Sequence, residues 1–119
     1  MLINLSNHPY SLWSDKQKEA ASLYGECIDL PFPQIDAMAD EANIKEIVDQ
    51  YFTKIQAQAA NNPVTVHLMG EMTFSFSLIE KLQQSDIPCI AATSARQVKD
   101  LGGGRKEIIF NFKRFRKYF

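Results

Sequence analysis

Three polar segments of the chain each follow a short apolar run, and they contain side chains that commonly bind phosphate. These segments are Ser6-Asn7-His8-Pro9, Gly70-Glu71-Met72-Thr73 and Thr93-Ser94-Ala95-Arg96. If the apolar runs are parallel strands of an open α/β sheet, a ligand binds beyond their carboxyl ends, where the winding of the chain reverses. The residues that we expect to converge on one cleft at this edge are Asn7, His8, Thr73, Ser94 and Arg96.

The segment from Gly70 to Thr73 opens a predicted helix, and two interpretations of it stay open. The free N–H groups and the positive dipole end of a helix attract anions, and Gly70 lets a ligand approach the backbone closely. Thr73 would then donate its hydroxyl to the ligand. Alternatively, Thr73 only caps the helix, and Glu71 favours its first turn electrostatically.

Arg96 is the strongest candidate for a phosphate ligand, because its planar guanidinium binds two phosphate oxygens at once. It follows the expected end of the fourth strand, and Thr93 and Ser94 add hydroxyl groups to the same segment. A single arginine in a loop is also commonly just exposed. His8 lies in a loop and can contact a ligand, whereas His67 lies inside the third predicted strand and is expected to be a satisfied core residue.

Several common site motifs are absent from the sequence. There is no G-x-G-x-x-G for a dinucleotide and no G-x-x-x-x-G-K-[ST] for a P-loop, and no helix pattern follows Gly102-Gly103-Gly104, so we expect a loop there. No H-E-x-x-H, C-x-x-C or group of carboxylates suggests a catalytic metal, and we predict neither a metal nor another cofactor. Cys27 and Cys89 lie in apolar runs and are expected to be reduced core residues.

Apolar periodicity predicts a single α/β domain over residues 1–119, in which strands and helices alternate. Strands are expected at Leu2–Leu5, Cys27–Leu30, Val64–Met69, Cys89–Ala92 and about Glu107–Phe112. Helices are expected from the capping residue Ser14 to about Tyr24, over Ala42–Ala59, and after Gly70. Such alternation implies right-handed β-α-β units, so we predict a Rossmann-like open sheet of four parallel strands, about three helices and an antiparallel C-terminal edge strand.

The net charge of −1 is unevenly distributed along the chain. Residues 1–98 hold six Lys/Arg and twelve Asp/Glu, a net −6, whereas residues 99–119 hold seven Lys/Arg and two Asp/Glu, a net +5. The basic end from Lys113 to Phe119 can bind a polyanion through cations and stacked aromatics. It can equally be an edge strand whose charges oppose aggregation while Phe115 and Phe119 pack inward. We favour the edge strand and do not expect a long nucleic acid as partner.

The chain begins without the basic and apolar segments of a secretory signal, and no run approaches the ~20 apolar residues of a membrane span. Its composition, 45% hydrophobic and 23% charged, is that of a folded globular protein. We therefore expect a cytoplasmic protein with no membrane partner.

Four segments, spread over nearly the whole chain, carry a family resemblance. They are Leu2-Ile3-Asn4-Leu5-Ser6-Asn7-His8-Pro9 followed by a helix, Asp29-Leu30-Pro31-Phe32-Pro33, Val66-His67-Leu68-Met69-Gly70-Glu71-Met72-Thr73, and Ala92-Thr93-Ser94-Ala95-Arg96. In this arrangement the chain resembles the very small CRISPR-associated proteins of type III systems that consist of one CARF-like (CRISPR-associated Rossmann-fold) domain. The resemblance implies a cyclic oligoadenylate, a ring-shaped RNA second messenger, as a ligand that lies across a homodimer.

Several proteins of this family are ring nucleases, which linearise the messenger and switch off the antiviral response. The 2′-hydroxyl of one ribose attacks the adjacent phosphate, and no metal takes part. The resemblance places Asn7, His8, Gly70, Glu71, Thr73, Thr93, Ser94 and Arg96 at the ligand, with His8, Ser94 and Arg96 assisting cleavage. The chain has no lysine directly after the fourth strand, where the best-studied members have one. The alternatives are a nucleotide-sensing or protein-interaction module without turnover, and an enzyme that acts on an unrelated metabolite.

Overall fold

The helices begin where the sequence supplies a side chain that accepts a hydrogen bond from the first turn. The computed structural model describes all residues, Met1–Phe119. At α1 (Asp15–Ser22), Ser14 Oγ accepts from the N–H of Gln17 at 3.2 Å, which confirms the predicted cap. At α2 (Glu41–Ala59), Asp40 and Asn43 form a capping box, in which each side chain accepts from the other residue's N–H.

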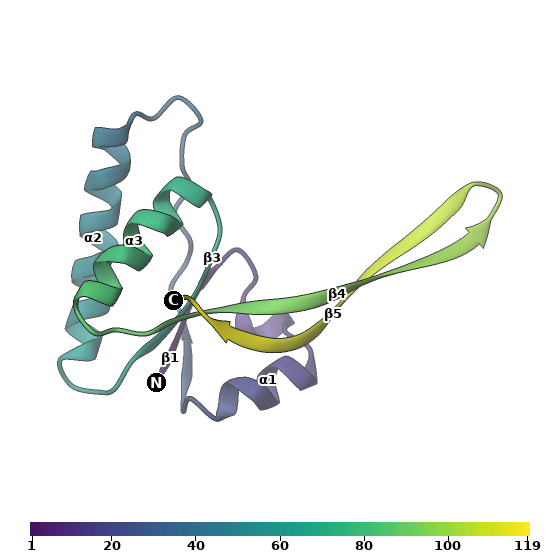
Figure 1. Cartoon of the computed structure of the whole chain (residues 1–119), viewed down its shortest axis with the longest axis horizontal. Helices are drawn as coiled ribbons and strands as arrows, with labels where there is room; N and C mark the ends of the chain where they lie inside the picture. Colours follow the sequence, from purple (N-terminus) through teal and green to yellow (C-terminus); the bar gives the residue numbers. More distant parts are fainter.

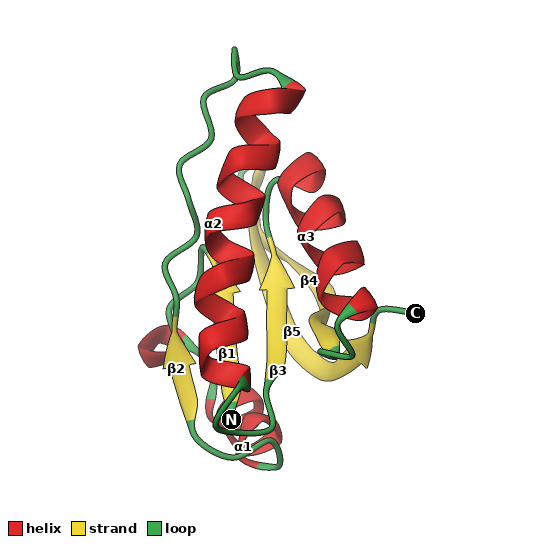
Figure 2. Ribbon diagram, turned by 90° about the vertical axis from the view of Figure 1, so that its left-hand side faces the viewer, coloured by secondary structure: helices red, strands yellow, loops and turns green.

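Five strands form one sheet in the order β2-β1-β3-β4-β5 (Figure 1, Figure 2). The remaining elements are β1 (Leu2–Ser6), the 3-10 turn η1 (Tyr10–Leu12), β2 (Cys27–Asp29), β3 (Thr65–Met69), α3 (Met72–Gln84), β4 (Cys89–Gly102) and β5 (Arg105–Lys117). β1 to β4 are parallel, and β5 pairs antiparallel with β4 at the edge. The prediction of an α/β sheet with four parallel strands, an antiparallel C-terminal edge strand and three helices is confirmed.

Each face of the sheet has its own apolar cluster, because alternate residues of a strand point to opposite faces. Ile3 and Leu5 of β1 pack with residues of α2 and α3, whereas Leu2 packs with Trp13 and Ala21 on the other face. Figure 2 shows α2 and α3 side by side in front of the sheet, with α1 behind it. The protein therefore has three layers, in which β1 and β3 are covered on both faces.

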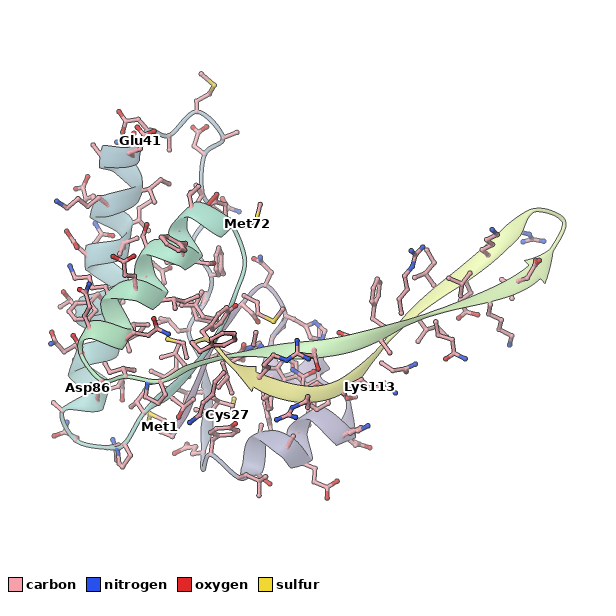
Figure 3. The ribbon with its side chains drawn as sticks, viewed as in Figure 1. Met1, Cys27, Glu41, Met72, Asp86 and Lys113 are labelled. Carbon is pink, nitrogen blue, oxygen red and sulfur yellow. The ribbon has the colours of Figure 1, made fainter.

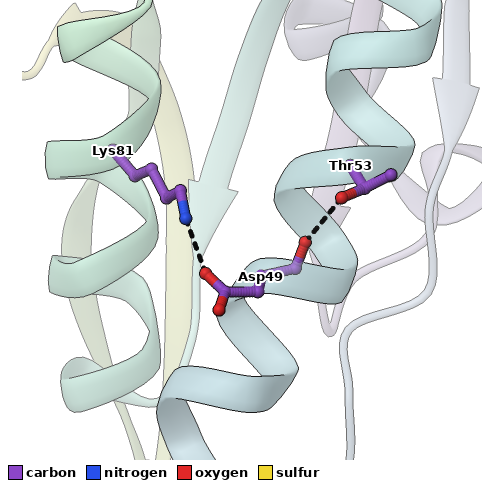
Figure 4. Close-up of polar contacts among 3 residues, drawn as sticks. All are labelled: Asp49, Thr53 and Lys81. Carbon is purple, nitrogen blue, oxygen red and sulfur yellow. Dashed lines mark hydrogen bonds and ion pairs between the residues drawn. The ribbon is translucent and has the colours of Figure 1, made fainter.

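The helices α2 and α3 contact each other through apolar and charged side chains. The buried face predicted for α2 is confirmed, because its members Ile44, Ile47, Val48, Tyr51, Phe52 and Ile55 lie in or against the core. Lys81 Nζ of α3 lies 2.6 Å from Asp49 Oδ1 of α2, and the Thr53 hydroxyl donates to the Asp49 carbonyl oxygen at 3.0 Å (Figure 4). The hydrogen bond from Lys81 lowers the pKa of Asp49. Since both charged side chains remain well exposed, the pair orients the helices more than it stabilises them.

β4 and β5 are longer than the sequence predicts. The expected end of β4 at Ala92 is wrong, because the strand continues to Gly102, and β5 extends beyond the predicted range 107–112 at both ends. Ladder hydrogen bonds need only backbone groups, so β4 can continue through residues 93–102, where the sequence shows no clear apolar alternation. The glycines of the predicted loop close this hairpin, with φ values of 81°, 61° and 79° at residues 102–104, in the left-handed region that glycine tolerates.

The distal part of the hairpin projects from the body as an arm, which we define as residues 95–111 (Figure 1). Every residue of the arm is exposed, and the molecule measures 52 × 38 × 25 Å as a result of its projection. The register of the ladder shifts between Thr93 and Ser94, at the base of the arm. Such a bulge increases the local twist and bends the strand, which directs the arm away from the sheet.

The end of β5 returns to the body. Phe115 is buried against Trp13 and Phe112, as predicted, but the expectation that Phe119 also packs inward is wrong. Phe119 lies beyond the last residue of β5 and is fully exposed, because no further strand covers it.

Both cysteines are free thiols in strands, as the sequence suggests. Cys89 is buried in β4 and Cys27 is half-buried in β2. Burial raises the pKa of Cys27 to about 11 and that of Cys89 to about 12, so both are protonated at neutral pH.

Gly70, directly after β3, has a packing role. A Cβ atom at this position would overlap the ring of Phe32. Phe32 in turn packs edge-to-face on the fully buried Phe74, with ring centroids 5.2 Å apart. Only a residue without a side chain therefore allows this ring to lie over the end of β3.

We expect Gly70→Ala to lower the free energy of unfolding by about 1–3 kcal/mol, because the ring of Phe32 must leave its contact with Phe74. Urea denaturation measures this loss. In a Phe32→Ala background the added methyl group meets no ring, so Gly70→Ala should then cost much less. Equal costs in both backgrounds would show that the ring is not the reason for the glycine.

Candidate ligand-binding site

A cavity of about 910 Å³ opens at the carboxyl ends of β1 and β3, beside Ala92 and Ser94 of β4. Its walls come from the loop after β1, from α1, from the end of β3 and from the base of the arm. The strand order reverses between β1 and β3, since β2 lies on one side of β1 and all later strands lie on the other. Ligands of open α/β sheets bind at this point, so the cavity lies where the topology favours a site.

The walls of this cavity carry basic side chains and no acidic ones. Lys16 of α1 and Lys113 of β5 line it together with His8 and His67, whereas none of the 14 acidic residues of the chain does. Figure 3 shows Lys113 where the arm joins the body. Because the chain as a whole has a net charge of −1, this local separation of charge favours an anionic ligand over a cation.

A row of polar side chains crosses the sheet beneath the cavity. Asp29, Asn4 and His67 are register neighbours on β2, β1 and β3, so their side chains point to the same face. The Asn4 Nδ2 group donates to Asp29 Oδ1 at 2.8 Å and to the carbonyl oxygen of His8 at 2.9 Å. Asn4 Oδ1 accepts from Ser6 Oγ at 2.8 Å and lies 2.9 Å from His67 Nδ1. Asn4 and His67 are each only 2% exposed, so these bonds replace their lost contacts with water.

The amide of Asn4 fixes which nitrogen of His67 carries the hydrogen. Both N–H groups of the amide face pure acceptors, the His8 carbonyl and the Asp29 carboxylate, so the atom next to His67 must be the amide oxygen. That oxygen can only accept, so His67 Nδ1 must donate and Nε2 must carry the lone pair. Nε2 is buried and has no hydrogen-bond partner.

His67 is an uncharged acceptor in the wall of the cavity. Its ring lies between Trp13 and Phe115, with centroid distances of 5.2 and 5.6 Å. Burial, and to a smaller extent the charge of His8, lowers the pKa of His67 to about 4. The expectation of a satisfied core histidine is confirmed for its burial and for the hydrogen bond at Nδ1. It is wrong for Nε2, which is buried without a hydrogen-bond partner.

The loop that carries His8 is held by its backbone, and its imidazole is exposed. The indole N–H of Trp13 and the amide of Asn4 both donate to the His8 carbonyl oxygen at 2.9 Å. Trp13 is itself 4% exposed and belongs to the apolar cluster of the α1 face. The core thus fixes the loop, while the His8 side chain remains available at the cavity.

The structure brings together half of the residues that the sequence predicts for the site. Asn7, His8, Gly70 and Ser94 line the cavity, from the ends of β1 and β3 and from β4. Glu71, Thr73, Thr93 and Arg96 do not line it.

Glu71 caps α3 and occupies the helix N-terminus where an anion was expected. Its carboxylate accepts from the Thr73 hydroxyl at 2.6 Å and from the N–H of Phe74 at 2.8 Å. These two hydrogen bonds, that of Thr73 first, lower the pKa of Glu71. The anion-site prediction for this turn is therefore wrong, because a resident carboxylate already fills it. Thr73 does not cap the helix either, and it lines a different groove between α2 and α3.

Thr93 and Arg96 lie in a strand and not in a loop after it. The Thr93 hydroxyl donates to the carbonyl oxygen of Arg114 at 3.0 Å and accepts from its N–H at 3.2 Å, so it is used within the sheet. Arg96 is exposed on the arm opposite Phe110 and lies outside the cavity. The expectation that Arg96 joins His8 in one cleft is wrong for a single chain, because β4 continues past it.

Lys16, Trp13, Phe110 and Lys113 are among the cavity residues that the sequence does not predict. Lys16 lies in the first turn of α1, where the sequence signals only a helix cap, and Lys113 belongs to the basic end of the chain. A signal for the polar row was present, since Asn4 and His67 each interrupt an apolar run in what become neighbouring parallel strands. Two such interruptions in paired strands indicate a buried hydrogen bond.

No group of three or more His, Cys, Asp or Glu side chains is arranged to hold a metal ion. None of the helices combines the length and the apolar composition needed to span a membrane.

In a comparison with protein families, residues 1–116 match a model described as the uncharacterized protein MJ1673 family. The chain belongs to this family. The matched range includes every residue that lines the cavity and the whole arm. No curated protein and no solved structure matches the chain.

We expect the stability of the protein to fall as the pH is lowered from about 6.5 to about 4. In this window the unfolded chain protonates His67 and the folded protein does not, so the unfolded state binds the additional proton. The lowered pKa of His67 corresponds to a decrease of about 3 kcal/mol in the free energy of unfolding between these two pH values. Urea unfolding at a series of pH values measures it.

The variant His67→Gln should lack this part of the pH dependence. His8→Gln is the matched control, because it removes an exposed imidazole and should leave most of the dependence in place. If the unfolding profiles of His67→Gln and the wild type run parallel from pH 6.5 to 4, His67 is not protonated on unfolding as described.

Glu71→Gln should lower the melting temperature at neutral pH, because it removes the negative charge at the N-terminus of α3. Because folding lowers the pKa of Glu71, the ionised carboxylate stabilises the folded state fully at pH values above 4.5, the pKa in the unfolded chain. This stabilisation disappears as the pH falls through the pKa of the folded protein. The two proteins should therefore converge in acid. Glu80→Gln, on the same helix, is the control, and a gap that persists in acid would contradict the assignment.

Proposed function

We propose that the protein binds a cyclic oligoadenylate in this cavity and cleaves the ring by attack of a ribose hydroxyl of the ligand. The observation that carries the proposal is a cavity of about 910 Å³ that contains Lys16, Lys113 and His8 and no acidic residue. The strand order is that of a Rossmann-like sheet with the cavity at its switch point, which supports a nucleotide as ligand. The sequence resemblance to small CARF-like proteins supports the same class of ligand.

The two lysines are suited to hold phosphates, because they reach the cavity from different walls. Lys16 comes from the first turn of α1, and Lys113 comes from β5 at the base of the arm. A ligand with several phosphates can contact both at once, which a mononucleotide does less well. Ser94 and Asn7 add neutral donors to the same cavity.

The cavity also has groups that suit adenine and ribose. Phe110 lines it with 67% of its surface exposed, so a base can stack on its ring. Asn7 and Ser94, which line the same cavity, can hydrogen-bond to the base or to a ribose hydroxyl. These contacts favour an adenosine-containing ligand over a simple polyphosphate.

The cleavage step needs no nucleophile from the protein. The 2′-oxygen forms a bond to the adjacent phosphorus, the bond from phosphorus to the 5′-oxygen of the next nucleotide breaks, and the 2′ proton passes to that 5′-oxygen. The product is linear and ends in a 2′,3′-cyclic phosphate at one end and a 5′-hydroxyl at the other. The protein aligns the reacting atoms, and Lys16 and Lys113 supply positive charge at the phosphate. His8, at the cavity, can relay the proton from the 2′-oxygen to the 5′-oxygen.

A sensor that binds the ring without cleaving it is the second candidate, because every contact named above except the proton relay serves binding alone. The two functions are distinguished by the product. A homodimer with the ligand across its two-fold axis is compatible with either.

We expect Lys113→Ala to weaken binding of cyclic tetra-adenylate ten- to a hundredfold, since one charge-assisted contact is worth about 1.5–3 kcal/mol. Lys117→Ala is the matched control, because it removes an exposed lysine of the same strand that does not line the cavity. Arg96→Ala should have little effect. Calorimetry measures binding, and chromatography of the products after incubation in EDTA measures cleavage.

If the folded protein binds no cyclic oligoadenylate of any ring size, this proposal is wrong. Binding without products in EDTA would favour the sensor, and cleavage that requires Mg²⁺ would refute the mechanism while leaving the ligand in place. Equal losses in Lys113→Ala and Lys117→Ala would place the ligand elsewhere.

A further inference from the structure

The arm has one apolar face that nothing in the chain covers. Val98 lies opposite Ile108 and Arg96 lies opposite Phe110 in the ladder, so the side chains of these two pairs share a face. Val98, Ile108 and Phe110 are 50%, 49% and 67% exposed. Because Phe110 also lines the ligand cavity, we call only Val98 and Ile108 the apolar face of the arm.

The opposite face of the arm is more polar. Asn111 donates to Gln97 across the strands at 3.2 Å, and Lys99 lies opposite Glu107. Ile109, which shares this face, is the least exposed of the large apolar residues on the arm. A two-stranded hairpin with solvent on both faces is only marginally stable in water. The contrast between its faces indicates that the apolar face is covered in the working protein.

A second exposed apolar surface lies on α3. A groove of about 460 Å³ contains Met72, Phe76, Ile79 and Phe119, which we call the α3 groove. Met72 is 83% exposed and Phe76 is 70% exposed. Figure 3 shows Met72 at the start of α3, with its side chain free of the body.

The arm and the α3 groove cannot meet within one chain, because the arm projects away from α2 and α3 (Figure 1). We propose that the apolar face of the arm docks in the α3 groove of a second copy of this chain, and that the second arm docks reciprocally in a closed two-fold dimer. Such a dimer covers both exposed surfaces with one repeated contact. This inference goes beyond the proposed function and does not depend on the ligand.

The charges of the two surfaces favour a second copy as the occupant. The arm holds Arg96, Lys99, Arg105 and Lys106 against Asp100 and Glu107, a net +2. The charged side chain of the α3 groove is Glu80, and residues 1–88 hold five Lys/Arg and twelve Asp/Glu, a net −7. A basic arm and an acidic body attract each other between copies.

A nucleic acid is the less favoured occupant of the arm. Asp100 lies opposite Lys106 and Glu107 lies opposite Lys99, so carboxylates face half of the cations on the arm. A polyanion would find unopposed cations at the other end of β5, where Lys113, Arg114, Arg116 and Lys117 lie. The arm has apolar side chains in its middle part and paired opposite charges near its tip. This distribution is typical of a surface that contacts another protein.

Sedimentation equilibrium of the full chain without ligand tests the dimer. We expect a species of twice the 13.6 kDa chain mass at micromolar concentration. Val98→Thr combined with Ile108→Thr keeps the β-branched shape of both residues and should raise the dimer dissociation constant at least tenfold. Phe76→Gln should do the same from the groove. Ile109→Thr is the matched control on the other face of the arm and should leave the dissociation constant unchanged.

Mixing the arm variant with the groove variant tests the pairing itself. Each variant has the surface that the other lacks, so the mixture should form a heterodimer with one restored contact. Circular dichroism and melting curves confirm that each variant is folded. A monomeric wild type, an arm variant that dimerises normally, a mixture that stays monomeric, or a wild type that forms open assemblies larger than the dimer would each overturn this proposal. Failure of cyclic oligoadenylate binding would leave it standing.

Discussion

The side-chain amide of Asn4 is the interaction on which the rest of the molecule depends. A buried amide has two donors and one acceptor oxygen to satisfy, and Asn4 does so with partners on β2, on β3 and in the loop after β1. One side chain therefore sets the register of three strands, the path of the loop that carries His8 and the tautomer of His67. An apolar residue of similar size would fill the same space, but it would leave the polar groups around it without partners.

The positive character of the cavity comes from side chains and not from the backbone. The N-terminus of α3 is the usual place for an anion at such a sheet edge, and here the carboxylate of Glu71 closes it. Charge is instead supplied by Lys16 and Lys113, which lie on long and exposed stems. A ligand held in this way interacts with flexible cations, so its affinity should decrease with salt more than that of a ligand held by backbone N–H groups.

The order of the elements in the body can be predicted from the sequence, whereas the length of the β4–β5 hairpin cannot. Periodicity in α2 and short apolar runs for β1 to β3 identified the core, because burial on one or both faces imposes a pattern. The part of β4 that lies in the arm has no buried face and no clear apolar alternation, so the sequence predicts that the strand ends at Ala92 and places Arg96 in a loop. The loops after β1 and β3 were located correctly, since the topology fixes them. The antiparallel edge strand itself is predicted, but its register along β4, which brings Lys113 to the cavity, is not, because local signals do not encode it.

The two sulfhydryl groups of the chain are poor nucleophiles, because burial keeps both in the protonated form at neutral pH. This makes the molecule well suited to site-directed labelling. A cysteine introduced at Lys106, near the tip of the arm, would be exposed and would react far faster than the native thiols under mild alkylation. A single fluorophore or spin label could therefore follow the motion of the arm in the otherwise unaltered protein.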